Sequence, residues 1–187
     1  MPVSYSNRVC HMTSRNQIKA DEERVGLELL RNPNQDAASI ARECGLSKQK
    51  VWRILKQFEE RGVIFSHPAC LNMKKLGKRS FLVLIERSIK PIDDNFIQNM
   101  IDPTLIKALV EQDIKAVVED CYLLNGVYDW AFIVTVEEHR DLLKFLDLWR
   151  KYYGEYFSKI TQSEIMWFNL RNSTQNPNPE EIREILR

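Results

Sequence analysis

A short stretch around one glycine limits most strongly what this chain can fold into. Residues 36–60 hold two helical apolar patterns separated by Gly45, a residue that permits the left-handed backbone of a tight helix-ending turn. Asp36 can cap the first helix and Ser47 the second. Two helices that cross closely need a small residue in the first and apolar residues on the buried side of the second. The residues that meet these needs are Ile40, Ala41, Leu46, Val51 and Ile54. The spacing therefore predicts a helix-turn-helix.

The flanking segments extend this motif to a small domain over residues 18–72. Apolar residues at helical spacing predict a helix over 18–31, ended by Asn32-Pro33-Asn34, and residues 1–17 show no such period and are predicted to form an arm. After the motif, Val63–Ser66 and Cys70–Asn72 are predicted to form two short strands around His67-Pro68. A helix-turn-helix followed by a hairpin is a winged helix-turn-helix.

The pattern changes to alternating strands and helices over residues 80–171. The predicted strands are Phe81–Glu86, Val117–Leu124, Tyr128–Val136 and one within Tyr156–Leu170, and the predicted helices are Phe96–Val110, broken near Asp102-Pro103, and a segment containing Leu142, Phe145, Leu146 and Trp149. Asn125-Gly126 is a hairpin signal. The order βαββαβ is that of a ferredoxin-like domain, so the whole chain is predicted to be α+β. Residues 172–187 form a polar tail with a short helix from Glu180.

The net charge of +1 hides two oppositely charged halves. Residues 1–80 carry 15 Lys and Arg against 8 Asp and Glu, whereas residues 81–187 carry 12 against 18. A basic half suits a phosphate backbone, which would repel the acidic half. The helix-turn-helix therefore lies in the half that favours double-stranded DNA.

Other function classes lack their sequence signals. The apolar runs are far shorter than the roughly 20 residues of a membrane span, and the first 20 residues contain no secretory apolar stretch, so we expect a cytoplasmic protein. The four cysteines and three histidines are scattered, without metal-ligand spacing, a catalytic triad or a glycine-rich phosphate loop. We expect no metal, no cofactor and no catalysis.

One face of the second motif helix carries side chains suited to DNA. With Val51, Leu55 and Phe58 turned inward, the candidate DNA-binding residues are Ser47, Lys48, Gln49, Lys50, Trp52, Arg53 and Lys56. Gln49 can pair with adenine and Arg53 with guanine, while the lysines and the Ser47 end of the helix can meet phosphates. The indole of Trp52 has two open roles, stacking on DNA or packing under the preceding helix.

Three segments resemble the Lrp/AsnC family of transcription regulators. They are Ala41–Ser47, Phe58–Ile64 and Tyr122–Trp130, and Lys50–Arg53 resembles archaeal members in particular. The resemblance implies a regulator that binds palindromic DNA as a dimer, with effector domains, called RAM, that pair and often assemble into octamers. It also implies an amino acid or other small effector near the second-domain hairpin. The candidate effector residues are Asn125, Gly126, Tyr128 and Asp129, with Thr161 and Ser163 of the last strand. The alternative for this hairpin is a purely structural turn that Asp129 braces.

Two further functions fit the same sequence less well. An abundant DNA-organising protein of low specificity could use the same basic surface. The sirohaem decarboxylases resemble this family in fold and need a basic pocket that bears histidine, but the corresponding stretch Lys78–Ser88 has two arginines and no histidine.

Overall fold

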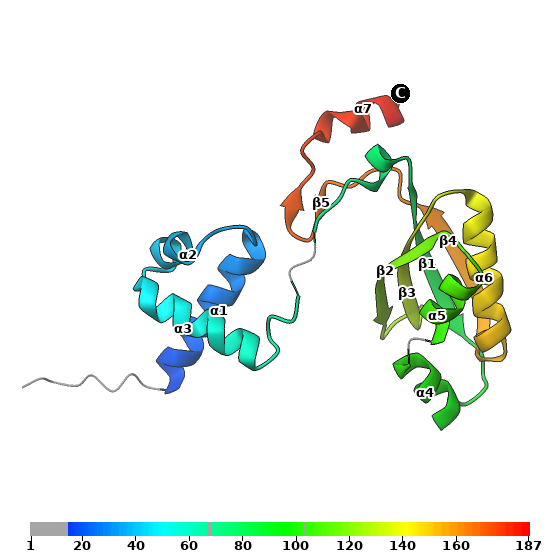
Figure 1. The fold of residues 1–187 in the computed structure, drawn as a ribbon, viewed down its shortest axis with the longest axis horizontal. Coiled ribbons are helices and arrows are strands. Elements are labelled where there is room, and N and C mark those ends of the chain that lie inside the picture. Colours follow the sequence, from blue (N-terminus) through cyan, green and yellow to red (C-terminus); the bar gives the residue numbers. More distant parts are fainter. Residues whose placement is uncertain (1–14, 67–68, 103) are drawn as a thin grey trace, which may run out of the picture. The chain divides into compact units, whose positions relative to one another are not determined.

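The computed structural model describes residues 15–66, 69–102 and 104–187, which form two compact units (Figure 1). The first unit runs to Cys70 and includes residues 169–179, and the second contains Leu71–Phe168 and residues 180–187. The grouping of 169–179 with the first unit differs from the predicted domain limits of 18–72, 80–171 and 172–187. No helix in the described part of the chain is long and apolar enough to cross a bilayer.

Three helices build the first unit: α1 (Arg15–Arg31), α2 (Ala37–Cys44) and α3 (Lys48–Glu60). The predicted start and end of α2 are confirmed, because the Asp36 carboxylate accepts a 2.8 Å hydrogen bond from the Ser39 amide and Gly45 takes a left-handed φ of 63°. Ser47 caps α3 through its hydroxyl oxygen, which accepts from the Lys50 amide at 3.3 Å. These caps satisfy helix-end groups that would otherwise lack partners.

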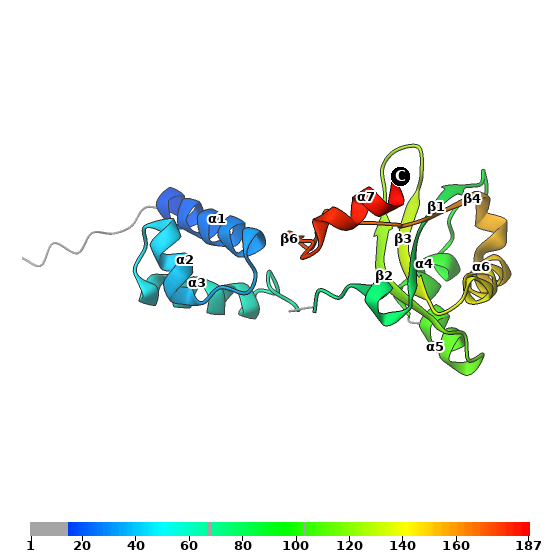
Figure 2. The same ribbon diagram turned by 90° about the horizontal axis from the view of Figure 1, so that it is seen from above.

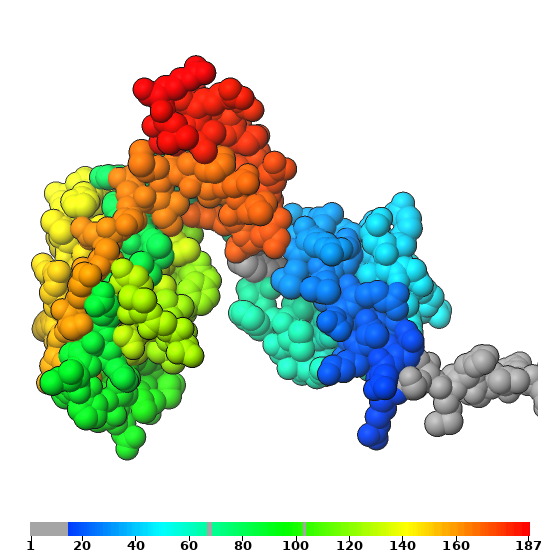
Figure 3. Space-filling model, turned by 180° about the vertical axis from the view of Figure 1, so that it is seen from behind, coloured from blue at the N-terminus to red at the C-terminus, as the bar shows by residue number. Residues whose placement is uncertain are grey.

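The three helices of this unit lie against one another (Figure 2), and apolar side chains from all three form its core. The buried members are Val25, Ile40, Ala41, Cys44, Val51, Ile54 and Phe58. Ile54 is buried as predicted, whereas Leu55, which was expected inside, is only half-buried against this core. In space-filling view these helices, coloured blue to cyan, close into one small body (Figure 3). The helix-turn-helix prediction is therefore confirmed.

The predicted strands of the wing are wrong in detail. Within residues 61–66 and 69–78 the structure contains no strand; it has a turn after α3 and a short 3-10 helix, η1 (Met73–Leu76). The amides of Val63 and Ile64 both donate to the Phe58 carbonyl, so they close the end of α3 and are not free for a ladder. His67-Pro68 lies outside the described residues. The hairpin of this unit comes from the tail: β5 (Leu170–Arg171) pairs with β6 (Thr174–Gln175).

The second unit is a four-stranded antiparallel sheet in the order β2-β3-β1-β4. Its strands are β1 (Arg79–Arg87), β2 (Ala116–Leu123), β3 (Trp130–Val136) and β4 (Phe157–Glu164). Its helices are α4 (Asp94–Ile101), α5 (Thr104–Glu111) and α6 (His139–Tyr153), followed by the short η2 (Gly154–Tyr156). The chain ends with η3 (Pro179–Glu181) and α7 (Ile182–Ile185). The βαββαβ prediction is confirmed, with its broken first helix; Pro103 itself is not among the described residues.

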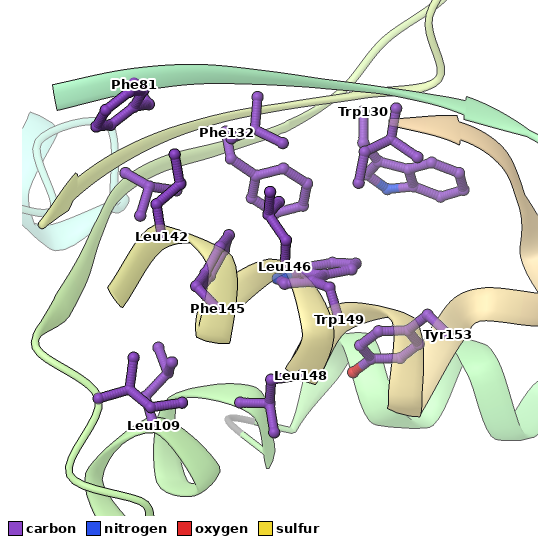
Figure 4. Packing of buried hydrophobic residues seen from close by; sticks show 14 of the residues in the cluster. Phe81, Leu109, Trp130, Phe132, Leu142, Phe145, Leu146, Leu148, Trp149 and Tyr153 are labelled. Atoms are coloured by element: carbon purple, nitrogen blue, oxygen red, sulfur yellow. The ribbon is translucent and has the colours of Figure 1, made fainter. Parts of the chain in front are cut away.

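The helices pack on one face of this sheet (Figure 4). Phe81 and Phe132 point from the strands toward α6, where Phe145 and Trp149 meet them, with Phe132 and Trp149 at a centroid distance of 4.5 Å. On the opposite face Leu82, Leu84 and Ile133 are half-buried. The sheet thus has one closed apolar face and one more open face.

Candidate nucleic-acid interface

Helix α3 presents a polar face because its apolar residues are committed to the core. Val51, Ile54 and Phe58 are at most 5 % exposed, and residues at the intervening positions point outward. The exposed residues on α3 and its N-cap are Ser47, Lys48, Gln49, Trp52, Arg53, Lys56, Gln57, Glu59 and Glu60. Six of these nine are among the predicted DNA-binding residues. Gln57, one helical turn beyond Arg53, was not predicted, and Glu59 and Glu60 are acidic residues at the far end of the helix.

The aromatic member of this face is exposed. Trp52 is 60 % exposed, and the Lys56 ammonium lies 5.6 Å from the centre of its ring. An indole with this exposure is not packed under α1. Lys56 also lies 3.8 Å from Glu60, a pair in which both side chains are more than half exposed. A surface pair of this kind is worth about 0–1 kcal/mol, so a phosphate can displace the carboxylate.

Charge is distributed unevenly along α3. Its first turn carries Lys48, and the amide end of a helix has a partial positive charge that attracts phosphate oxygens. Arg53 is exposed and forms no hydrogen bond or ion pair within the described part of the chain. The acidic residues Glu59 and Glu60 lie at the other end. The arrangement can hold anions at the start of α3 and offers a free guanidinium in its middle.

Lys50 is placed differently from the prediction that it meets phosphate. Its ammonium forms an ion pair with the Asp21 carboxylate of α1, and its side chain is 26 % exposed. The reason is a buried carboxylate 29 residues earlier in the chain, which needs a cation. Lys50 therefore points toward α1, away from the outer face of α3.

The candidate effector hairpin is braced from within the second unit. The Asp129 carboxylate accepts a 2.7 Å hydrogen bond from the Arg87 amide, and the Asp129 amide donates to the Ile85 carbonyl at 2.8 Å. The predicted hairpin is confirmed, but its connection from β2 to β3 is six residues long, 124–129, which is longer than the stretch between the predicted strands, and Gly126 is not left-handed. These bonds give Asp129 the bracing role that the sequence left open as an alternative.

The other candidate effector residues come from the 124–129 connection and from β4. Asn125 and Gly126 are exposed in the connection, and Tyr128 is half-buried. Thr161 and Ser163 pair with Leu84 and Leu82 of β1, on the open face of the sheet. In the sheet, β1 lies between β4, which carries Thr161 and Ser163, and β3, which follows the 124–129 connection.

The part of the chain that the structure describes contains a cavity but no metal site. Among the described residues no group of three or more His, Cys, Asp or Glu could hold a metal ion. A cavity of about 360 Å³ in the second unit lies elsewhere, lined by residues of α6 and of the segment after α5: Gln112, Ile114, Lys144, Asp147, Leu148 and Lys151.

Comparison with known proteins agrees with this geometry. Residues 27–64 match the family described as winged helix-turn-helix DNA-binding. The chain is 30 % identical over 148 residues to the proline dehydrogenase transcriptional activator of Rhodobacter capsulatus, covering 76 % of this chain and 82 % of that protein. Solved structures that share the fold include two regulators. The leucine response regulatory protein LrpA of Mycobacterium tuberculosis has a TM-score of 0.56 at 22 % identity, over 84 % of this chain and 98 % of the other. A transcriptional regulator of Neisseria meningitidis, solved as a complex with L-methionine, has a TM-score of 0.52 at 15 % identity, over 86 % and 97 %.

A helix-turn-helix unit with an exposed basic helix, joined to a ferredoxin-like unit, defines a DNA-binding transcriptional regulator. The similarity of this chain to a transcriptional activator over 82 % of that protein's length indicates the family within this class. The chain belongs to the Lrp/AsnC family of transcription regulators.

Proposed function

We propose that two copies of the chain bind a palindromic promoter site, each placing α3 in the major groove. The observation that carries the proposal is the division of α3, which buries Val51, Ile54 and Phe58 and leaves Gln49 and Arg53 exposed. A helix of this type fits the major groove, where each base pair presents a distinct pattern of donors and acceptors. In a two-fold dimer the half-sites are about 10 base pairs apart, or a multiple of this.

The roles of the contact residues follow from their chemistry. Arg53 donates two hydrogen bonds to guanine, and Gln49 pairs with adenine. Lys48, Lys56 and the amides near Ser47 bind phosphates, and Trp52 stacks on sugar or on a thymine methyl. Phosphate contacts fix the register, whereas Arg53 and Gln49 choose the sequence.

The dimer forms through the second unit. Its open sheet face has the half-buried apolar residues Leu82, Leu84 and Ile133, and pairing two such faces removes them from water. Thr161 and Ser163 lie on the same face, so they line the surface between copies. Further association of dimers gives octamers, as the family resemblance implies.

A small effector, an amino acid, binds where copies meet near the 124–129 connection. A related regulator is complexed with L-methionine, which supports this ligand class. The exposed backbone around Asn125 and Gly126 can hold a carboxylate. Because Asp129 is already bonded to Arg87, the effector's ammonium is bound by a residue of the neighbouring copy or by Tyr128.

The chain regulates transcription in the cytoplasm without catalysis of its own. In the stretch where a tetrapyrrole decarboxylase would need free cations, Arg79 is paired with Glu164 and Arg87 with Asp129. Both arginines are therefore engaged by carboxylates. A sirohaem titration followed by absorbance tests this point, and a spectral change would contradict it.

Selection of bound duplexes from random DNA at physiological salt tests the proposed function. We expect a two-fold symmetric consensus with half-sites about one helical turn apart. Repeating the selection with a panel of amino acids identifies the effector by a change in affinity or spacing. A pool without a consensus would contradict sequence-specific regulation and would favour a DNA-organising protein.

A further inference from the structure

The first unit contains a buried carboxylate that the interface described above does not use. Asp21 lies on α1 with its side chain 1 % exposed. Its oxygens accept hydrogen bonds from Lys50, from Arg24 at 2.6 Å and from Gln17 at 3.0 Å. A buried charge is costly unless it is paired and hydrogen-bonded, and here both conditions are met.

The carboxylate is ionised in the folded protein. The hydrogen bond from Lys50 is the main cause that lowers the pKa of Asp21 below its usual value, with help from Gln17 and Arg24 and against the effect of burial. The negative charge therefore persists at neutral pH and cancels the charge of the lysine that faces it.

Asp21 connects the three helices of the first unit, α1, α2 and α3, whose relative positions define the helix-turn-helix. Lys50 lies in the first turn of α3, so its ammonium ties the start of that helix to α1. Arg24, which shares the carboxylate, also donates a 3.1 Å hydrogen bond to the carbonyl of Cys44, the last residue of α2. One buried side chain thus joins α1, the end of α2 and the start of α3.

We propose that Asp21 is a positioning residue for DNA recognition, which fixes the start of α3 through Lys50 and keeps this lysine away from phosphates. The inference rests on the proposed DNA face of α3 and deepens it. Lys48 and Lys50 are two residues apart, yet they have different tasks: Lys48 binds the DNA backbone, and Lys50 sets the angle at which α3 enters the groove.

Salt dependence separates these tasks. Each phosphate contact adds about 0.9 to the slope of log K against log salt concentration. Lys48→Met, the matched control, removes one contact per copy and should lower the slope by about 1.8 per dimer. Lys50→Met should leave the slope unchanged and weaken binding by the same factor at every salt concentration. Lys50→Arg, which retains the ion pair, should restore affinity.

Two results would overturn the inference. One is a fall in slope for Lys50→Met equal to that of Lys48→Met, which would make Lys50 a phosphate contact. The other is normal affinity for Lys50→Met, which would leave the pair without influence on DNA binding. If Lys48→Met and Arg53→Ala also bind normally, the α3 face itself is not the interface, and the proposed function fails instead.

A second variant covers the case in which Lys50→Met does not fold. The double variant Asp21→Asn, Lys50→Gln keeps hydrogen-bonding groups at both positions and removes both charges of the Asp21–Lys50 pair. Its slope should equal that of the unaltered protein, and a slope lower by about 1.8 would contradict the inference. Circular dichroism establishes that each variant is folded before binding is measured.

Discussion

Replacement of Arg53 by alanine should reduce sequence discrimination without unfolding the protein. Arg53 is exposed and forms no hydrogen bond or ion pair in the described part of the chain. Its loss should therefore change the free energy of unfolding by no more than about 0.5 kcal/mol. A guanine contact is worth about 1–3 kcal/mol, so two copies on a palindrome lose about 2–6 kcal/mol, a weakening of about 30-fold to 10⁴-fold.

The assay compares two duplexes and two variants. Fluorescence anisotropy gives Kd for the selected consensus and for a scrambled duplex of equal length. Arg53→Ala should weaken binding to the consensus and hardly affect the scrambled duplex, whereas Lys56→Ala should weaken both alike. An unchanged ratio of the two Kd values for Arg53→Ala would refute the assignment of Arg53 to a base edge.

Three further predictions concern stability and use urea unfolding followed by circular dichroism. Ser47→Ala removes the cap of α3 and should cost about 0.5–2 kcal/mol, whereas Ser47→Asp, which still caps, should cost less; equal losses would contradict the capping role. Phe96→Ala should lower the free energy of unfolding by about 3–5 kcal/mol, because the ring centroid of Phe96 lies 5.5 Å from that of Trp130 and 4.7 Å from that of Tyr156. A loss below about 1 kcal/mol would be inconsistent with this packing. Hydrogen bonds from the backbone amide of Phe96 and then from the Tyr156 hydroxyl lower the pKa of Asp93, so its ionised carboxylate stabilises the fold fully above about pH 4, and this stabilisation is lost as pH falls through the lowered pKa. Asp93→Asn, which retains a capping group, should flatten the acid part of the plot of unfolding free energy against pH. An unaltered plot would contradict this role of Asp93.

The helix ends, the order of strands and helices, and the outer face of α3 could be predicted from the sequence. Gly45 and Ser47 mark helix ends by backbone conformation and capping, effects that involve residues within one turn. The βαββαβ order of the second unit was also predictable, because alternating strands and helices leave few arrangements. The outer face of α3 was predictable for the same reason, since three buried apolar residues determine which side is exposed.

Other features depend on partners distant in sequence. Lys50 was predicted to bind phosphate because nothing in the nearby sequence indicates that Asp21, 29 residues earlier, is buried and pairs with it. The strands expected after α3 did not form, because the Phe58 carbonyl takes the amides of Val63 and Ile64. Asn125-Gly126 suggested a tight turn, whereas the bonds of Asp129 to β1 hold open a longer connection.

Protection of guanine N7 from methylation by dimethyl sulfate tests the central claim, because this atom lies in the major groove. On the selected duplex we expect protected guanines in two half-sites whose centres are about 10 base pairs apart, and loss of that protection with Arg53→Ala. Guanines that stay fully reactive under saturating protein, or protection that is the same with Arg53→Ala, would contradict the placement of α3 in the groove.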